Sequence, residues 1–157
     1  MKKIASFQVD HTKLTYGIYL SRKDAVGKSI AYTYDIRMKI PNKEPVMDTC
    51  SLHALEHLGA TYLRTVQKNV PVVYFGPMGC RTGFYLITAK ELCEKERFEL
   101  VKSMLEWINK FEGKIPGASA KECGNYLDLN LNMAKFEANL FYKKLLKFKK
   151  ENFVYPK

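Results

Sequence analysis

Two histidines and a glutamate stand at a spacing that suits a metal site. His53, Glu56 and His57 lie in a segment whose leucines recur at helical intervals. Side chains four positions apart on a helix share one face, so both imidazoles could reach a single divalent ion. Glu56 would stay near that face, better placed to transfer protons than to bind the metal. Two surface histidines on an ordinary helix are the alternative, and we favour the metal site because the chain has only 3 histidines.

This motif does not complete a catalytic site, which typically has three protein ligands. Cys50 would lie on the same helical face as both histidines. However, Cys50 and His57 are seven positions apart, which is roughly 10.5 Å along a helix. Donor atoms that share one ion lie within about 4 Å of one another. We therefore expect the third ligand elsewhere, at a position that periodicity does not identify.

A second candidate is Cys80, in a turn of residues 76–83 that contains three glycines. Glycines let a backbone bend sharply and approach a ligand closely. A thiol there, beside Arg81, could have a depressed pKa and act as a thiolate or proton carrier. A buried thiol that serves only as a small apolar group is an equally good interpretation. Cys93, within a helical stretch, is expected to be inert.

Composition indicates a globular protein of the cytoplasm. The chain has 157 residues, of which 46% are hydrophobic, so one domain spanning residues 1–157 is expected. The N-terminal lysines precede no apolar secretory segment, and no apolar run approaches the ~20 residues that span a membrane. The 4 cysteines could form two disulfides only in an oxidising compartment. They include no Cys-x-x-Cys pair, which argues against a four-cysteine zinc site.

The net charge of +10 and the 10 tyrosines raise the possibility of a nucleic-acid-binding module. The lysines are scattered, except for a basic tail that begins at about residue 143. We therefore favour an ordinary solvated surface over nucleic-acid binding.

Periodicity predicts an α+β protein in which helices pack on one face of an antiparallel sheet. Residues 30–40 alternate, with apolar side chains on one face and Thr33, Asp35, Arg37 and Lys39 on the other. A helix should begin near Asp48 or Thr49, both good N-caps. Further strands are expected at residues 6–10, 14–20, 70–75 and 83–88, the last two paired as a hairpin, and helices at 94–111 and 131–150.

Several motifs together resemble the LuxS family of S-ribosylhomocysteine lyases. They lie at residues 6–11, 34–37, 41–42, 53–57, 77–85 and 121–124, in family order, and the resemblance extends from residue 4 to about 140. Pro-Met-Gly-Cys together with His-x-x-Glu-His is a highly specific combination. The family cleaves S-ribosylhomocysteine to homocysteine and a dihydroxypentanedione, the precursor of autoinducer-2.

The resemblance also implies roles for particular residues. His53, His57 and Cys123 match the metal ligands, and Cys80 and Glu56 match the catalytic acid–base pair. The family metal is ferrous iron, which zinc or cobalt can replace. Family members are homodimers with sites at the interface. The positions that contact the ribose, and that would reach the metal of a partner subunit, are Ser6, His11 and Arg37.

One segment departs from the family pattern. Many relatives have Asp-Ile-Ser before the Pro-Met-Gly-Cys motif, whereas this chain has residues 74–76 as Tyr-Phe-Gly. The homocysteine end of the pocket is therefore expected to bind through backbone groups. A metallohydrolase with a downstream carboxylate as its third ligand is the alternative enzyme, and in it Cys80 would have no role.

Overall fold

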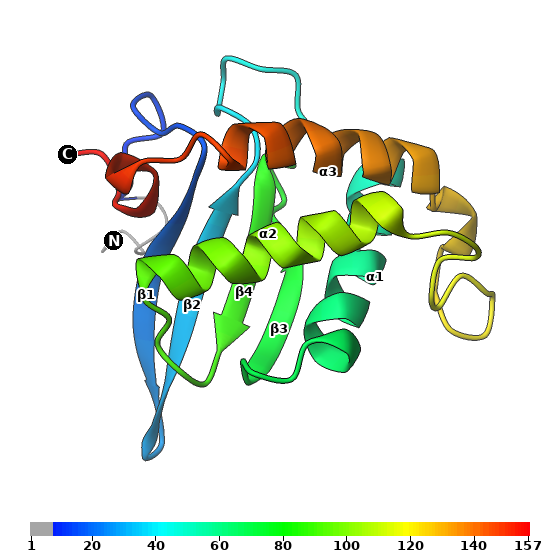
Figure 1. Cartoon of the computed structure of the whole chain (residues 1–157), viewed down its shortest axis with the longest axis horizontal. Helices are drawn as coiled ribbons and strands as arrows, with labels where there is room; N and C mark the ends of the chain where they lie inside the picture. The colour runs from blue at the N-terminus through cyan, green and yellow to red at the C-terminus, as the bar shows by residue number, and fades with distance from the viewer. Residues whose placement is uncertain (1–7) are drawn as a thin grey trace, which may run out of the picture.

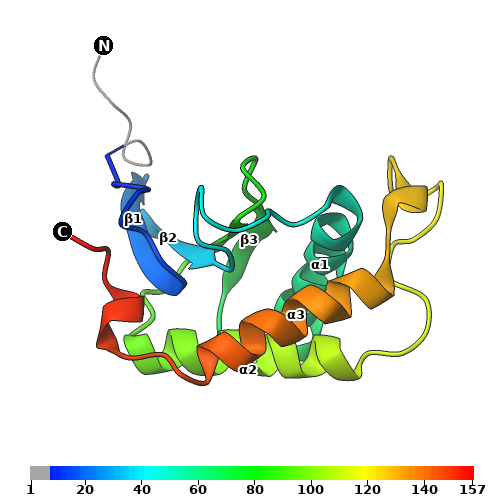
Figure 2. The same cartoon turned by 90° about the horizontal axis from the view of Figure 1, so that it is seen from above.

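The computed structural model describes residues 8–157, in which four antiparallel strands form one sheet. The strands are β1 (Gly17–Val26), β2 (Ser29–Arg37), β3 (Val72–Pro77) and β4 (Gly83–Thr88), in the order β1-β2-β4-β3. The helices α1 (Thr49–Thr61), α2 (Glu94–Lys110) and α3 (Leu131–Leu145) gather on one side of the sheet (Figure 1, Figure 2). The predicted α+β class is therefore confirmed.

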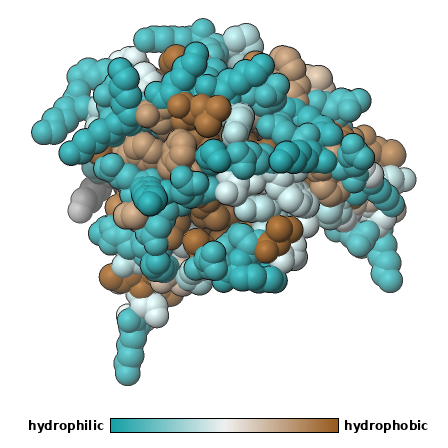
Figure 3. Space-filling model, viewed as in Figure 1, coloured by the Kyte–Doolittle hydropathy of each residue, from teal (hydrophilic) through white to brown (hydrophobic). Residues whose placement is uncertain are grey.

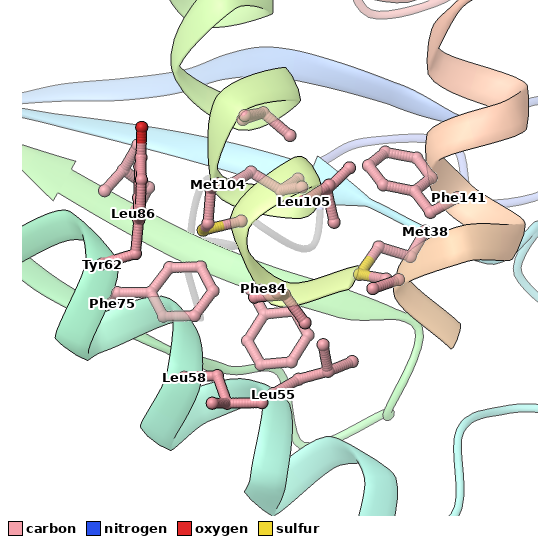
Figure 4. Packing of buried hydrophobic residues seen from close by; sticks show 14 of the residues in the cluster. Met38, Leu55, Leu58, Tyr62, Phe75, Phe84, Leu86, Met104, Leu105 and Phe141 are labelled. Atoms are coloured by element: carbon pink, nitrogen blue, oxygen red, sulfur yellow. The ribbon is translucent and has the colours of Figure 1, made fainter. Parts of the chain in front are cut away.

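The core lies between the sheet and the helices (Figure 4). Phe75 of β3 and Phe84 of β4 stack with ring centroids 4.8 Å apart, and α1 and α2 cover them with Leu55 and Leu105. The predicted apolar stripe of α1 is buried throughout. Packing against this core fixes the rotation of α1, and with it the direction in which the histidines point.

Helix α1 begins where the sequence indicated. Asp48 is its N-cap, and the carboxylate of Asp48 accepts a hydrogen bond of 2.8 Å from the backbone N–H of Ser51. The helix continues into a short π-helical segment, Tyr62–Val66.

The strand predictions are right in position and wrong at several ends. β2 stops at Arg37 rather than at residue 40, because the N–H groups of Met38 and Lys39 both donate to the carbonyl of Thr82. β1 starts at Gly17 and runs on to Val26, past the predicted residues 14–20. The hairpin of β3 and β4 is confirmed. Ile30, expected on the buried face, is exposed, since the β1–β2 hairpin extends beyond the helices (Figure 1).

The two ends of the chain differ from expectation. Residues 8–10 form a turn and a bend, so the strand predicted at residues 6–10 is wrong in this part, and residues 6 and 7 lie outside the described range. α3 ends at Leu145 rather than at Lys150. Beyond it the chain turns back, so that Phe148 packs edge-on against Phe141 and Phe153, and a short 3-10 helix follows at Lys150–Phe153.

The surface in the view of Figure 1 is largely hydrophilic (Figure 3). None of the helices in residues 8–157 has the length and apolar character that crossing a bilayer requires.

Candidate metal centre and thiol pocket

Three donor groups converge beside α1. His53 and His57 lie one turn apart, with ring centroids 4.8 Å apart. Cys123, from the loop after α2, brings its Sγ to 3.5 Å from Nε2 of His53. One ligand atom from each of the three residues lies within 4.8 Å of the others. The arrangement fits a metal ion with one thiolate and two imidazole ligands.

The surroundings orient the two imidazoles for this task. Nδ1 of His57 donates to the carbonyl of Pro116 at 2.8 Å, which leaves Nε2 free for a metal. Gly117 permits this approach, because it has a φ of +74° and a Cβ there would lie 3.1 Å from Nδ1 of His57. On the other ring, Nδ1 of His53 lies 3.8 Å from a carboxylate oxygen of Asp128. Nε2 of His53 therefore faces Cys123, and Nε2 of His57 is left available for the same ion.

The Cys50 thiol lies outside the cluster of metal donors. It donates to the Asp128 carboxylate at 3.1 Å and is not among the three converging groups. This agrees with the helical rise, which put Cys50 too far from His57 to share an ion. The third donor is a thiol, which differs from the carboxylate that the hydrolase alternative predicted.

Cys80 lies in a separate pocket of about 310 Å³ on the sheet face opposite the helices. The pocket is lined by His11, Asp35, Arg37, Cys80, Tyr85 and Tyr155, among others. Asp35, Arg37 and Tyr85 point here because they alternate along β2 and β4 with the core residues. The face of β2 that the sequence marked as polar is therefore buried around a site, with Asp35 only 1% and Arg37 only 3% exposed.

Hydrogen bonds and charge favour the thiolate of Cys80. Nη1 of Arg37 lies 3.8 Å from Sγ of Cys80 and donates to the Thr82 hydroxyl at 2.5 Å. That hydroxyl lies 3.0 Å from Sγ, and since it accepts from Arg37, its own hydrogen is free for the sulfur. Burial opposes ionisation, but the bonds from Thr82 and the charge of Arg37 outweigh it and lower the pKa of Cys80. The sequence suggested that Arg81 would lower the pKa of Cys80. In the structure Arg37 has this effect.

Six of the predicted site residues fall into two groups, and Glu56 belongs to neither. His53, His57 and Cys123 lie together, and Cys80, Arg37 and His11 lie together. Glu56 is half-buried on α1 and has no hydrogen-bond or ion-pair partner within residues 8–157. Ser6 lies outside the described residues.

Arg37 and Cys80 line one pocket of the same chain. A site shared between subunits would therefore take both residues from one chain.

Sequence reasoning missed several residues that support these groups. Thr82 and Asp35 adjoin predicted site residues, and the alternation of Asp35 with Arg37 on one strand face was the available signal. Asp128 and Pro116, which orient the histidines, and Tyr155, which lines the pocket, carry no local signal because only the tertiary fold brings them there.

Comparison with known proteins agrees with this arrangement. Residues 4–152 match the LuxS family, described as S-ribosylhomocysteinase. The chain is similar to the S-ribosylhomocysteine lyases of Finegoldia magna (53% identical over 156 residues), Clostridium beijerinckii (51% over 158) and Borreliella burgdorferi (50% over 157). Each alignment covers 99% of this chain and 99 to 100% of the relative. The match therefore continues past residue 140, where the resemblance was expected to end. A family match and identities of this extent, with both motif groups in place, show that the chain belongs to the LuxS family.

Proposed function

We propose that the chain is an S-ribosylhomocysteine lyase, which releases homocysteine and a dihydroxypentanedione. The observation that carries this proposal is the pairing of two groups in a LuxS-family chain. One is the cluster of His53, His57 and Cys123, with ligand atoms within 4.8 Å of one another. The other is the Cys80 thiol, whose pKa is lowered beside Arg37.

The metal cluster suits a borderline-soft divalent ion. One thiolate and two imidazoles favour iron, zinc or cobalt over magnesium or calcium. We propose ferrous iron in the cell, with zinc or cobalt able to replace it. When bound, such an ion acts as a Lewis acid toward the carbonyl and hydroxyl oxygens of the substrate.

The reaction moves a carbonyl along the ribose chain and then eliminates the sulfur. Each shift of the carbonyl removes a proton from one carbon and returns one to its neighbour, so a base and an acid must alternate. The Cys80 thiolate is suited to remove the carbon-bound protons, and the hydrogen bonds from Thr82 and the charge of Arg37 favour this ionised form. Glu56, whose carboxylate has no partner within residues 8–157, is suited to carry protons to and from the oxygens.

The last step breaks the carbon–sulfur bond. A proton leaves the carbon next to the carbonyl, its electron pair forms a double bond, and homocysteine departs as a thiolate that takes up a proton. His11, Arg37 and Ser6 are proposed to hold the ribose portion during these steps. For His11 and Arg37, the support is their place in the wall of the Cys80 pocket.

We further propose a homodimer with shared sites. Neither the metal-ligand residues nor Glu56 line the Cys80 pocket of the same chain. That pocket is lined by residues on one face of the sheet. The helices lie on the other side of the sheet (Figure 2). A second copy packed on this face could bring its metal cluster to the pocket, and each chain would then complete the site of the other. The 4 free cysteines suit the reducing cytoplasm in which we place the enzyme.

The test is an incubation with S-ribosylhomocysteine, in which released homocysteine thiol is followed. Wild-type enzyme should release thiol catalytically. Cys80→Ala and Glu56→Gln should retain metal and fold but lose at least the ~10²-fold that a positioned acid–base group contributes. Cys93→Ala, at the exposed N-terminal end of α2, is the matched cysteine control and should remain active. Wild-type protein that carries metal yet releases no homocysteine would refute the assignment.

A further inference from the structure

The C-terminal end of the chain forms part of the Cys80 pocket. Tyr155 lines this pocket, although it follows the last helix of the fold. Its ring stacks on Tyr19 of β1, with centroids 4.7 Å apart and an interplanar angle of 18°. Figure 1 shows the C-terminal segment lying beside β1. A residue far from the motifs is thus held against the site.

Several specific contacts hold this segment in place. Nη1 of the buried Arg97 donates to the carbonyl of Ile18 at 2.7 Å and to that of Phe153 at 3.3 Å. The guanidinium also lies 5.5 Å from the ring centroid of Phe153. The side-chain amide of Asn152 donates to the carbonyl of Tyr16 at 2.9 Å. Arg97 of α2 and the backbone at the start of β1 therefore fix the path of the chain just before Tyr155.

Tyr155 begins a line of hydrogen bonds that ends at the thiol. Its hydroxyl donates to Oδ2 of Asp35 at 2.9 Å, and Nη2 of Arg37 donates to the same oxygen at 2.5 Å. Arg37 in turn reaches Thr82 and Cys80 through Nη1. Burial and the adjacent Asp35 carboxylate raise the pKa of Tyr155, so the hydroxyl keeps its proton and serves as the donor.

The hydroxyl of Tyr155 is one of the few groups within residues 8–157 that donate a hydrogen bond to the Asp35 carboxylate. Oδ1 of Asp35 and Nε of Arg37 are buried and have no hydrogen-bond partner within residues 8–157. Without the hydroxyl, Oδ2 would keep Arg37 as its one remaining donor within residues 8–157. The guanidinium could then turn to bind both carboxylate oxygens through Nε and Nη2, a favoured geometry. That turn would withdraw Nη1 from Thr82 and Cys80.

We propose that Tyr155 is a positioning residue for the lyase reaction, which holds Asp35 so that Arg37 stays directed at Thr82 and Cys80. The expected loss of turnover rests on the proposed function. The expected effect on the ionisation of the Cys80 thiol does not. The terminal segment thereby acquires a role in the site.

The test compares Tyr155→Phe, which keeps the stacked ring, with Tyr142→Phe. Tyr142 also donates to a carboxylate, that of Glu106 at 2.7 Å, on the surface between α2 and α3. Tyr155→Phe should lower kcat about tenfold, the usual scale for a hydrogen bond to a charged group, with a smaller change in KM. Tyr142→Phe should match wild type. A Tyr155→Phe enzyme with wild-type kcat would overturn the proposal.

A second readout does not require turnover. The alkylation rate of Cys80 by iodoacetamide, resolved from the other cysteines by peptide mass spectrometry, should reach its midpoint at a higher pH in Tyr155→Phe than in wild type. Deletion of residues 155–157 should give the same shift, whereas deletion of 156–157 should not. Loss of thermal stability with an unchanged alkylation profile would show a merely structural role and overturn the proposal, even if the wild-type protein proved to lack lyase activity.

Discussion

At the scale of single residues, the side chains that bind or react depend on neighbours that fix their chemical state. His57 donates to Pro116, so its other nitrogen is free, and Thr82 accepts from Arg37, so its hydrogen is directed at Cys80. In both cases one hydrogen bond determines which proton or lone pair is available. Variants of these groups should therefore separate metal binding from proton transfer.

The first prediction distinguishes the two cysteines near His53. His57→Ala and Cys123→Ala should each lower metal affinity by more than the ~10–100-fold that outer-shell changes cost, because each removes a ligand. Cys50→Ser should retain the metal, since the Cys50 thiol donates to the Asp128 carboxylate that flanks His53 and is not among the three converging donors. The measurement is the metal-to-protein ratio by elemental analysis after dialysis. An unchanged ratio in Cys123→Ala would contradict the assignment.

The second prediction concerns the pH dependence of Cys80. Hydrogen-bond donation stabilises the anionic thiolate and lowers the pKa of Cys80, so the reactive form is present above that lowered pKa and is lost as pH falls through it. Thr82→Val removes the donor and should move the acid limb of the pH–activity profile to higher pH. Thr82→Ser keeps the hydroxyl and should leave the limb in place. If both variants give the wild-type profile, Thr82 does not control the thiol.

At the scale of elements, α1 carries two residues of the metal cluster, and the β2–β4 pair carries part of the wall of the Cys80 pocket. α1 presents His53 and His57 because Leu55 and Leu58 fix its opposite side in the core. β2 and β4 present Arg37 and Tyr85 because alternation places these residues on the face away from the helices. The geometry of each group depends on where its element begins and how that element is rotated.

The third prediction tests the start of α1. Asp48→Ala removes the carboxylate that caps the N–H of Ser51, and should lower the free energy of unfolding by about 1 kcal/mol. Asp48→Asn keeps an acceptor and should cost much less. Urea unfolding followed by circular dichroism measures both variants. Equal stabilities of the Ala and Asn proteins would show that the cap does not stabilise the helix.

At the scale of the whole molecule, the fold separates the metal cluster from the Cys80 pocket. The cluster lies between α1 and the loop that carries Cys123, whereas the pocket lies on the helix-free face of the sheet. The proposed dimer would join them, and an exchange of subunits can test this.

The fourth prediction is complementation between two inactive variants. Cys80→Ala and His57→Ala chains, mixed and allowed to exchange, should recover about a quarter of wild-type activity, since half the dimers would be hybrids with one intact site of two. Cys80→Ala mixed with Arg37→Ala should recover none, because both residues belong to one pocket. Homocysteine release after verified exchange is the measurement. No recovery in the first mixture would show that each site draws both groups from one chain.

The sequence by itself determined the local features of this protein. The pairing of His53 with His57, the capped start of α1 and the β3–β4 hairpin all follow from periodicity and turn chemistry, which act over a few residues. Family motifs pointed to Cys80 and Cys123. The alternation of β2 also placed Arg37 on a polar face, since neighbouring residues of a strand point to opposite sides.

Only the tertiary structure decided which distant groups meet. Cys123 comes to His53 across 70 residues, Arg37 to Cys80 across 43, and Tyr155 to Asp35 across 120. Such contacts depend on how the sheet, the helices and the connecting loops pack together, and no local pattern records that packing. The burial of Asp35 and Arg37 has the same origin: alternation gave their direction, but the chain that covers them comes from residues 9–11 and from the C-terminal end.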